Sequence, residues 1–190
     1  LPGSGGRVLL AGFDMRYVGD ETLMLWESLL ECAGAGAAGF RIEGNWLLGL
    51  LRRGAAATFL TLANVAGRHG ASRISVSLRD GRTVAFEAEL LPNAARCLLL
   101  DVPLADSNRL LYTSSELTPV GGDRTRFLAA GCPGTAGAIA FDRAVRLVIN
   151  GRKRTTRRRD GAFVADYVHG SALAEIVLEA PGSGRGRQRR

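Results

Sequence analysis

The clearest fold signal lies in residues 74–90, which read ISVSLRDGRTVAFEAEL. On each side of a central turn, apolar residues alternate with polar ones, and the turn itself carries the pair Asp80-Gly81. Alternation of this kind is typical of a strand with one buried face, and an Asp-Gly pair favours a tight hairpin turn. The stretch therefore predicts an antiparallel hairpin whose core face contains Ile74, Val76, Leu78, Val84, Phe86 and Leu90.

The segments on either side of this hairpin predict its neighbours. Downstream, residues 96–104 read as a third antiparallel strand in the same sheet, and Pro103 favours a position at a sheet edge. Upstream, residues 40–43 alternate as a strand, and Asn45 is a suitable N-cap for a helix. This helix would continue through an Ala-rich segment to residue 66, and it would cover the apolar face of the hairpin.

The second half of the chain has the turn-rich composition and short apolar runs of further strands. Residues 105–135 are rich in Ser, Thr, Gly and Pro and predict a linker or long loop that contains one short strand. The strands expected in this half cover residues 109–113, 138–141, 145–149, 162–168 and 173–178. The last four would form a meander, and its middle connection is very basic.

The composition is that of a globular, basic protein. The 190 residues include 25 basic and 18 acidic side chains, which leave a formal charge of +7, and 46% of the residues are apolar. These proportions exclude a disordered chain. No uninterrupted apolar run approaches the roughly 18–20 residues of a membrane-spanning helix, so no membrane partner is expected.

No motif predicts catalysis, a metal or a cofactor. The three cysteines stand far apart, without the spacing of a zinc site. His69 and His169 sit beside glycines and are expected to be solvated turn residues. The glycines at 34, 36 and 39 match a dinucleotide fingerprint as text, but a strand follows them where a helix is required. The chain is therefore not expected to be an enzyme.

The strongest charge feature is a run of six cations within eight residues, namely Arg152, Lys153, Arg154, Arg157, Arg158 and Arg159. Like charges so close together repel one another, which favours an exposed hairpin tip. Such a tip could be a solvated surface only, a contact to nucleic-acid phosphates, or a nuclear import signal.

Several segments resemble a known family. Residues 40–53 are similar to the strand and channel-lining helix of PCNA-like DNA sliding clamps. Residues 74–104 most resemble the Hus-one-type subunit of the checkpoint clamp, the nine-one-one complex. Residues 145–149, 163–168 and 174–181 look like the closing strands of a clamp's second domain.

The resemblance implies an α+β, sliding-clamp-like fold with antiparallel sheets and a few helices packed on one face. It implies a first clamp-like domain over residues 1–104 that lacks its N-terminal part, and a linker and loop over 105–137. The closing strands of a second clamp-like domain would follow over 138–181, and a Gly/Arg tail over 182–190.

The resemblance also implies a function. The chain would be a non-catalytic subunit of a nuclear ring that encircles double-stranded DNA in damage checkpoint signalling and repair. Arg52, Arg53 and Arg68 would meet DNA phosphates from inside the ring. Expected partners are the other subunits of a heterotrimeric ring, joined by edge-strand pairing, a clamp loader, and repair or checkpoint proteins. The alternative is a small basic nucleic-acid-binding or viral structural protein that uses the hairpin Arg152–Arg159.

Overall fold

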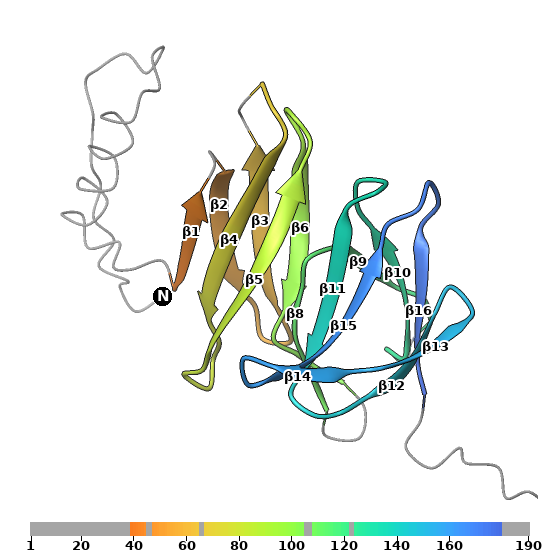
Figure 1. Ribbon diagram of the computed structural model, residues 1–190. Coiled ribbons are helices and arrows are strands. Elements are labelled where there is room, and N and C mark those ends of the chain that lie inside the picture. Colours follow the sequence, from red (N-terminus) through yellow and green to blue (C-terminus); the bar gives the residue numbers. More distant parts are fainter. Residues whose placement is uncertain (1–38, 45–46, 65–66, 105–107, 122–123, 180–190) are drawn as a thin grey trace, which may run out of the picture. The chain divides into compact units, whose positions relative to one another are not determined.

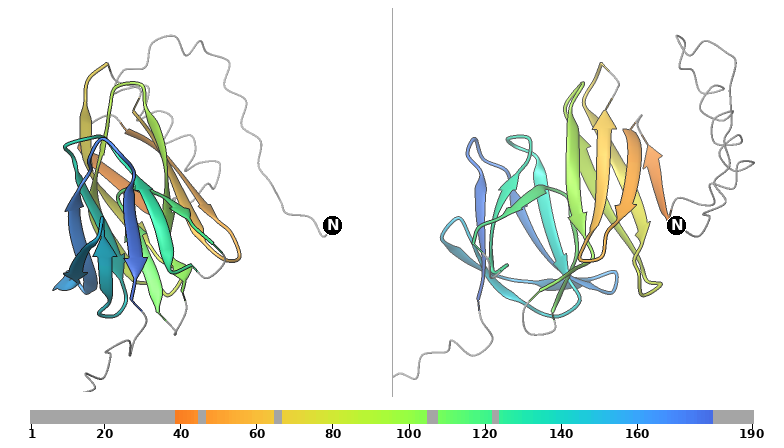
Figure 2. Two further views of the ribbon diagram at one scale, coloured as in Figure 1. Left: turned by 90° about the vertical axis from the view of Figure 1, so that its right-hand side faces the viewer. Right: turned by 180° about the vertical axis from the view of Figure 1, so that it is seen from behind.

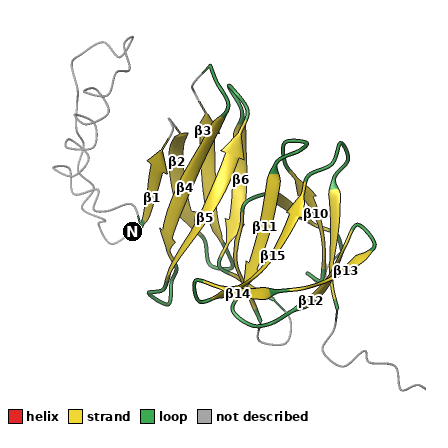
Figure 3. Cartoon of the chain, viewed as in Figure 1, coloured by secondary structure: helices red, strands yellow, loops and turns green. Residues whose placement is uncertain are grey.

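The computed structural model describes residues 39–44, 47–64, 67–104, 108–121 and 124–179. In these ranges the regular secondary structure consists of strands alone (Figure 3). The strands form four small antiparallel sheets, here named sheets A to D (Figure 1). Within the described part there is no helix long and apolar enough to cross a membrane.

Sheets A and B are three-stranded. Sheet A has the order β1-β4-β5, with β1 at Phe40–Gly44, β4 at Gly70–Ser77 and β5 at Thr83–Leu90. Sheet B has the order β2-β3-β6, with β2 at Leu47–Arg53, β3 at Thr58–Asn64 and β6 at Ala95–Leu100.

Sheets C and D are five-stranded. Sheet C has the order β14-β15-β11-β8-β7, with bounds Arg157–Arg159, Ala162–Val168, Ala136–Phe141, Arg109–Thr113 and Val102–Pro103. Sheet D has the order β13-β12-β16-β10-β9, with bounds Arg152–Thr155, Arg146–Ile149, Ala174–Leu178, Arg126–Ala130 and Glu116–Pro119.

The predicted hairpin at 74–90 is confirmed. Strands β4 and β5 pair antiparallel, with Ile74 opposite Phe86 and Val76 opposite Val84. Gly81 adopts a φ of +84°, as the Asp-Gly pair requires, and the Leu78 amide donates to the carbonyl of Arg82 across the turn.

The predicted α+β, clamp-like fold is wrong, since the described chain is all-β. The helix expected from Asn45 to residue 66 is replaced by the hairpin of β2 and β3, in which Leu51 lies opposite Leu60. Strand β3 alternates strictly between buried and less buried residues, which is the pattern of a strand with one face on the core. Pairing with distant strands thus overrides the helix propensity of its leucines and alanines.

The predicted position of the third strand is also wrong. Strand β6 does not join the β4–β5 hairpin. It pairs with β3 in sheet B, where Leu98 lies opposite Leu60. Pro103 does lie at a sheet edge as predicted, because β7 is the outermost strand of sheet C. Gly34, Gly36 and the tail at 182–190 lie outside the described residues.

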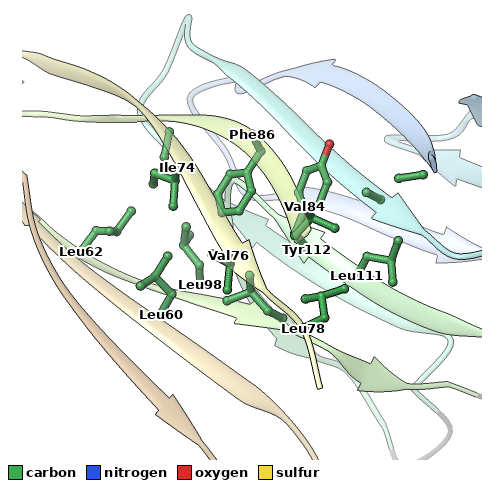
Figure 4. Packing of buried hydrophobic residues seen from close by; sticks show 14 of the residues in the cluster. Leu60, Leu62, Ile74, Val76, Leu78, Val84, Phe86, Leu98, Leu111 and Tyr112 are labelled. Atoms are coloured by element: carbon green, nitrogen blue, oxygen red, sulfur yellow. The ribbon is translucent and has the colours of Figure 1, made fainter. Parts of the chain in front are cut away.

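The first of two cores lies between sheets A and B and one face of sheet C. Leu60, Leu62, Ile74 and Val76 are fully buried in it (Figure 4). Phe86 of sheet A stacks on Tyr112 of sheet C, with ring centroids 4.7 Å apart. The hairpin face predicted to meet a helix therefore meets two other sheets.

The second core lies between sheets C and D, so sheet C is buried on both faces. Along β11, Ala140 faces the first core, whereas Ile139 and Phe141 face the second. A strand buried on both faces reads as a continuous apolar run without alternation, which is why this half gave a weaker sequence pattern.

The four sheets are arranged in a ring that resembles a four-bladed β-propeller (Figure 2). Sheet A packs on B and C, sheet C packs on D, and β6 of sheet B lies beside β9 of sheet D. A propeller blade is a four-stranded meander. Here each sheet has three or five strands drawn from separate parts of the chain, and the meander predicted for residues 138–178 is split between sheets C and D.

Candidate nucleic-acid interface

The basic run is built from two consecutive hairpins. Strand β12 turns into β13 through Asn150-Gly151, with φ values of 50° and 74°. Strand β14 turns into β15 through Asp160-Gly161, with φ values of 48° and 79°. Two central residues with positive φ define the type I′ turn, whose twist suits a two-residue hairpin and which favours Asn-Gly and Asp-Gly.

Thr156 joins the two hairpins where the chain passes from sheet D to sheet C. It is the buried member of an otherwise exposed segment. Its hydroxyl accepts a hydrogen bond of 3.0 Å from the Val145 amide, and its own amide donates to the Val145 carbonyl at 3.2 Å. This double contact fixes the crossing point and thereby holds β13 and β14 in place.

We name residues Arg152–Arg159 the basic edge, because β13 and β14 are the outermost strands of sheets D and C. Its cations are all exposed. Their backbones are fixed by pairing, with Arg154 opposite Leu147 and Arg158 opposite Phe163. Side chains on one side of such a strand repeat at about 6.6–6.8 Å, twice the rise per residue. The run is therefore a set of cations on paired strands, with neighbouring side chains pointing to opposite sides of each strand.

Most of this charge is not neutralised by the described acids. Lys153 lies 3.6 Å from Glu179, and Arg159 forms an ion pair with Asp166. The hydrogen bond to Asp166 raises the pKa of Arg159, so that guanidinium stays charged. The remaining cations form no ion pair and no side-chain hydrogen bond within the described ranges; they are Arg152, Arg154, Arg157 and Arg158.

Two further arginines extend the positive surface. Arg143 and Arg146 are both exposed; Arg146 is the first residue of β12, and Arg143 lies just before that strand. Arg146 is directly opposite Thr155 in the pairing of β12 with β13. Residues directly opposite in an antiparallel pair point to the same side of the sheet, so Arg146 adds its charge beside the edge strand.

The predicted basic run is therefore a real surface feature, but its predicted form, a hairpin tip, is wrong. The tips are Asn150-Gly151 and Asp160-Gly161, and the cations lie on the paired strands between them. Both dipeptides are strong hairpin signals in the sequence. Taken as turns, these two dipeptides would have predicted that the cations lie on strands between two hairpin turns.

The arginines that the clamp resemblance assigned to a channel lie elsewhere. Arg52 and Arg53 are exposed at the end of β2, an outer strand of sheet B, and Arg53 donates to the Ser77 carbonyl at 2.9 Å. Arg68 is exposed in the connection between β3 and β4. A strand, not an inward-facing helix, thus carries the first two, and they are separated in sequence from the basic edge.

A second group of polar residues is buried, and here the sequence prediction for one histidine is wrong. His69 is exposed beside Glu89, as expected. His169 is 4% exposed, and its Nε2 lies 2.9 Å from the Ser115 hydroxyl, to which Tyr167 donates at 2.7 Å. A serine and a histidine at this distance suggest a nucleophile and its base. Ser115, however, is completely enclosed, so the contact offers no surface to a substrate.

The described residues contain no candidate metal site, and comparisons with known proteins identified no relative. In the described part of the chain, no group of three His, Cys, Asp or Glu side chains lies close enough together to hold a metal ion. No protein-family model matches the chain. No curated protein shows significant similarity to it.

Proposed function

We propose that the protein binds nucleic acid through the basic edge, by contacts to the phosphate backbone. The observation that carries the proposal is the group of four exposed arginines without acidic partners in the described structure, held on two paired strands. Arginine suits this task because its guanidinium keeps its charge and can donate two hydrogen bonds to one phosphate.

The contacts would be independent of sequence. Recognition of particular bases requires side chains that reach base edges, whereas phosphate contacts fix position and supply most of the affinity. The basic edge offers cations and one exposed threonine, Thr155, with no aromatic side chain in the run on which a base could stack. The expected ligand is therefore any nucleic acid whose backbone can lie along the two strands.

The same cations also have a structural use. Charged side chains on an outer strand discourage pairing with other chains, so part of the composition of β13 and β14 serves to protect the sheet edges. This protection works with charge of either sign, whereas phosphate binding requires positive charge. Charge reversal thus separates the two uses.

The fold does not support the clamp function, because the segment expected to form the channel-lining helix forms the paired strands β2 and β3. The roles in damage signalling, the nuclear location and the clamp partners follow from the resemblance alone. Nucleic-acid binding through Arg152–Arg159 was the alternative, and it is the function that the geometry favours.

A direct experiment compares the wild-type chain with a variant carrying Arg154→Glu, Arg157→Glu and Arg158→Glu. Fluorescence anisotropy with a labelled DNA duplex is expected to show loss of binding, while circular dichroism and thermal unfolding remain those of a folded chain. Triple replacement of Arg52, Arg53 and Arg68 by Glu is the matched control and should bind far better. Equal binding by the wild type and the 154/157/158 variant would contradict the proposal.

A further inference from the structure

The outermost strands of the four sheets differ in where their charged residues and prolines lie, and one strand has a long uncharged stretch. Among the described strands, the eight outermost are β1, β5, β2, β6, β13, β9, β14 and β7. All eight contain a charged residue or a proline, as in Glu87 and Glu89 of β5, Arg96 of β6 and Pro119 of β9. Such residues are what normally prevent edge-to-edge association.

The strand with the uncharged stretch is β2. Its first five residues, Leu47–Leu51, read LLGLL, and its charges are confined to the last two positions. Leu48 is 47% exposed and Leu50 66% exposed, both on the outer face of sheet B. An edge whose first five residues are uncharged and leucine-rich, with exposed apolar side chains, is a template for another strand.

The sequence of β2 is self-complementary. If two copies of this strand pair antiparallel about Gly49, Leu47 of one lies opposite Leu51 of the other, and Leu48 lies opposite Leu50. Leucine then meets leucine at every position beside the central glycine. An interface between identical surfaces related by a two-fold axis requires this kind of self-complementarity.

Strand β1, the outer strand of sheet A that lies beside β2, is self-complementary in charge. It reads FRIEG, and Arg41 and Glu43 are exposed on the same side, 3.3 Å apart. Antiparallel pairing of two copies about Ile42 places Arg41 of one copy opposite Glu43 of the other. Opposite charges facing each other across strands favour pairing.

The central residues of the two proposed strand pairings, Ile42 of β1 and Gly49 of β2, lie directly opposite each other between sheets A and B. The side chain of Ile42 packs directly over Gly49, because a Cβ atom placed on Gly49 would lie only 2.8 Å from Ile42 Cδ1 and 2.5 Å from a ring carbon of Phe40. A single two-fold axis perpendicular to the sheets can therefore pair β1 with β1 and β2 with β2 at once.

We propose that two copies of this chain form a dimer by continuing sheets A and B across β1 and β2. The occupant of this edge is a second copy, because the two outer strands that meet there are self-complementary, one in apolar side chains and the other in charge. The two-fold operation closes on itself, so association ends at the dimer.

Sedimentation velocity of the full chain over a range of protein concentrations tests the proposal, and a reversible monomer–dimer equilibrium is expected. Leu50→Lys places a cation opposite Leu48 of the other copy and should weaken association at least about tenfold, or roughly 1.4 kcal/mol. Leu173→Lys, which alters another exposed leucine, is the matched control and should leave the equilibrium unchanged.

A charge exchange tests the pairing of β1. Arg41→Glu alone puts two acidic residues opposite each other and should weaken the dimer. The double variant Arg41→Glu/Glu43→Arg restores opposite charges and should recover it. A wild-type chain that stays monomeric, forms open-ended oligomers, or dimerises unchanged with Leu50→Lys would overturn the proposal. So would failure of the double variant to exceed the single one.

Discussion

The hydroxyl of Ser115 lies 2.9 Å from Nε2 of His169, and both side chains are buried. Tyr167 donates to the same hydroxyl at 2.7 Å. The Ser115 oxygen has two lone pairs, so it can accept from Tyr167 while it either accepts from or donates to Nε2, according to the imidazole tautomer. Burial, together with the positive charge of Arg96, lowers the pKa of His169.

The first prediction is that the protein loses stability in mild acid through this histidine. The folded state holds His169 neutral below its ordinary pKa of about 6.5, whereas the unfolded chain takes up the proton there. The free energy of unfolding should therefore fall as pH decreases from about 6.5 towards the folded-state pKa, by at most about 1.4 kcal/mol per pH unit. Urea unfolding at several pH values measures this slope.

The histidine responsible can be identified by substitution. His169→Gln removes the titrating group and should flatten the acid slope, although it lowers stability at neutral pH. His69→Gln makes the same substitution at an exposed imidazole and is the comparison variant. If the His169 variant retains the wild-type slope, the assignment is wrong.

A second prediction concerns the glycine beneath this ring. A Cβ at Gly131 would lie 2.2 Å from His169 Nε2, so the imidazole packs against a bare Cα. Gly131→Ala is expected to lower the free energy of unfolding by about 1–3 kcal/mol through overpacking. Gly67→Ala, where nothing lies within 4 Å of the added atom, is the control and should be close to neutral.

A third prediction tests how the basic edge is held. Thr156→Val keeps the shape of the side chain but leaves the Val145 amide without its acceptor. Leaving a buried donor unsatisfied should cost about 1–3 kcal/mol in urea unfolding. Thr155→Val makes the same chemical change on the exposed neighbour and should cost little. Equal effects of the two substitutions would show that Thr156 is no anchor.

A fourth prediction concerns the buried carboxylate of Asp101. Its oxygens lie 2.5 Å from Arg109 Nε and 3.6 Å from Arg79 Nε, and the side chain is 0% exposed. Asp101→Asn should lower the free energy of unfolding by about 3 kcal/mol, at the lower end for a buried pair because both arginines remain partly hydrated. Asp166→Asn breaks an exposed pair with Arg159 and should cost less than about 1 kcal/mol.

How far the fold could be predicted depends on the environment of each strand. The hairpin at 74–90 has one buried face and a turn that only a few residue pairs favour, so local pattern was sufficient. Strand β2 has leucine on both faces because its outer face is exposed and apolar, and without alternation its leucines suggested a helix. The partner of β6 depends on chain closure over more than thirty residues, which no local pattern records.

The sequence predicted the positive charge of the candidate site but not the strand pairing that holds it. Six cations in eight residues are plain in the sequence. Their pairing depends on β12 and β15 and on the buried position of Thr156, a polar residue that hydrophobic patterning does not select. The interior position of His169 could not be inferred, because its partner Ser115 is 54 residues away.

The most direct test of the central claim is the salt dependence of DNA binding. Each phosphate neutralised on duplex DNA contributes roughly 0.9 to the slope of log affinity against log salt concentration. The variant Arg154→Gln/Arg157→Gln/Arg158→Gln should therefore lower the slope by about 2–3, whereas Arg52→Gln/Arg53→Gln/Arg68→Gln, with the same loss of charge, should leave it nearly unchanged. If the second variant loses the slope and the first retains it, the basic edge does not bind the phosphates.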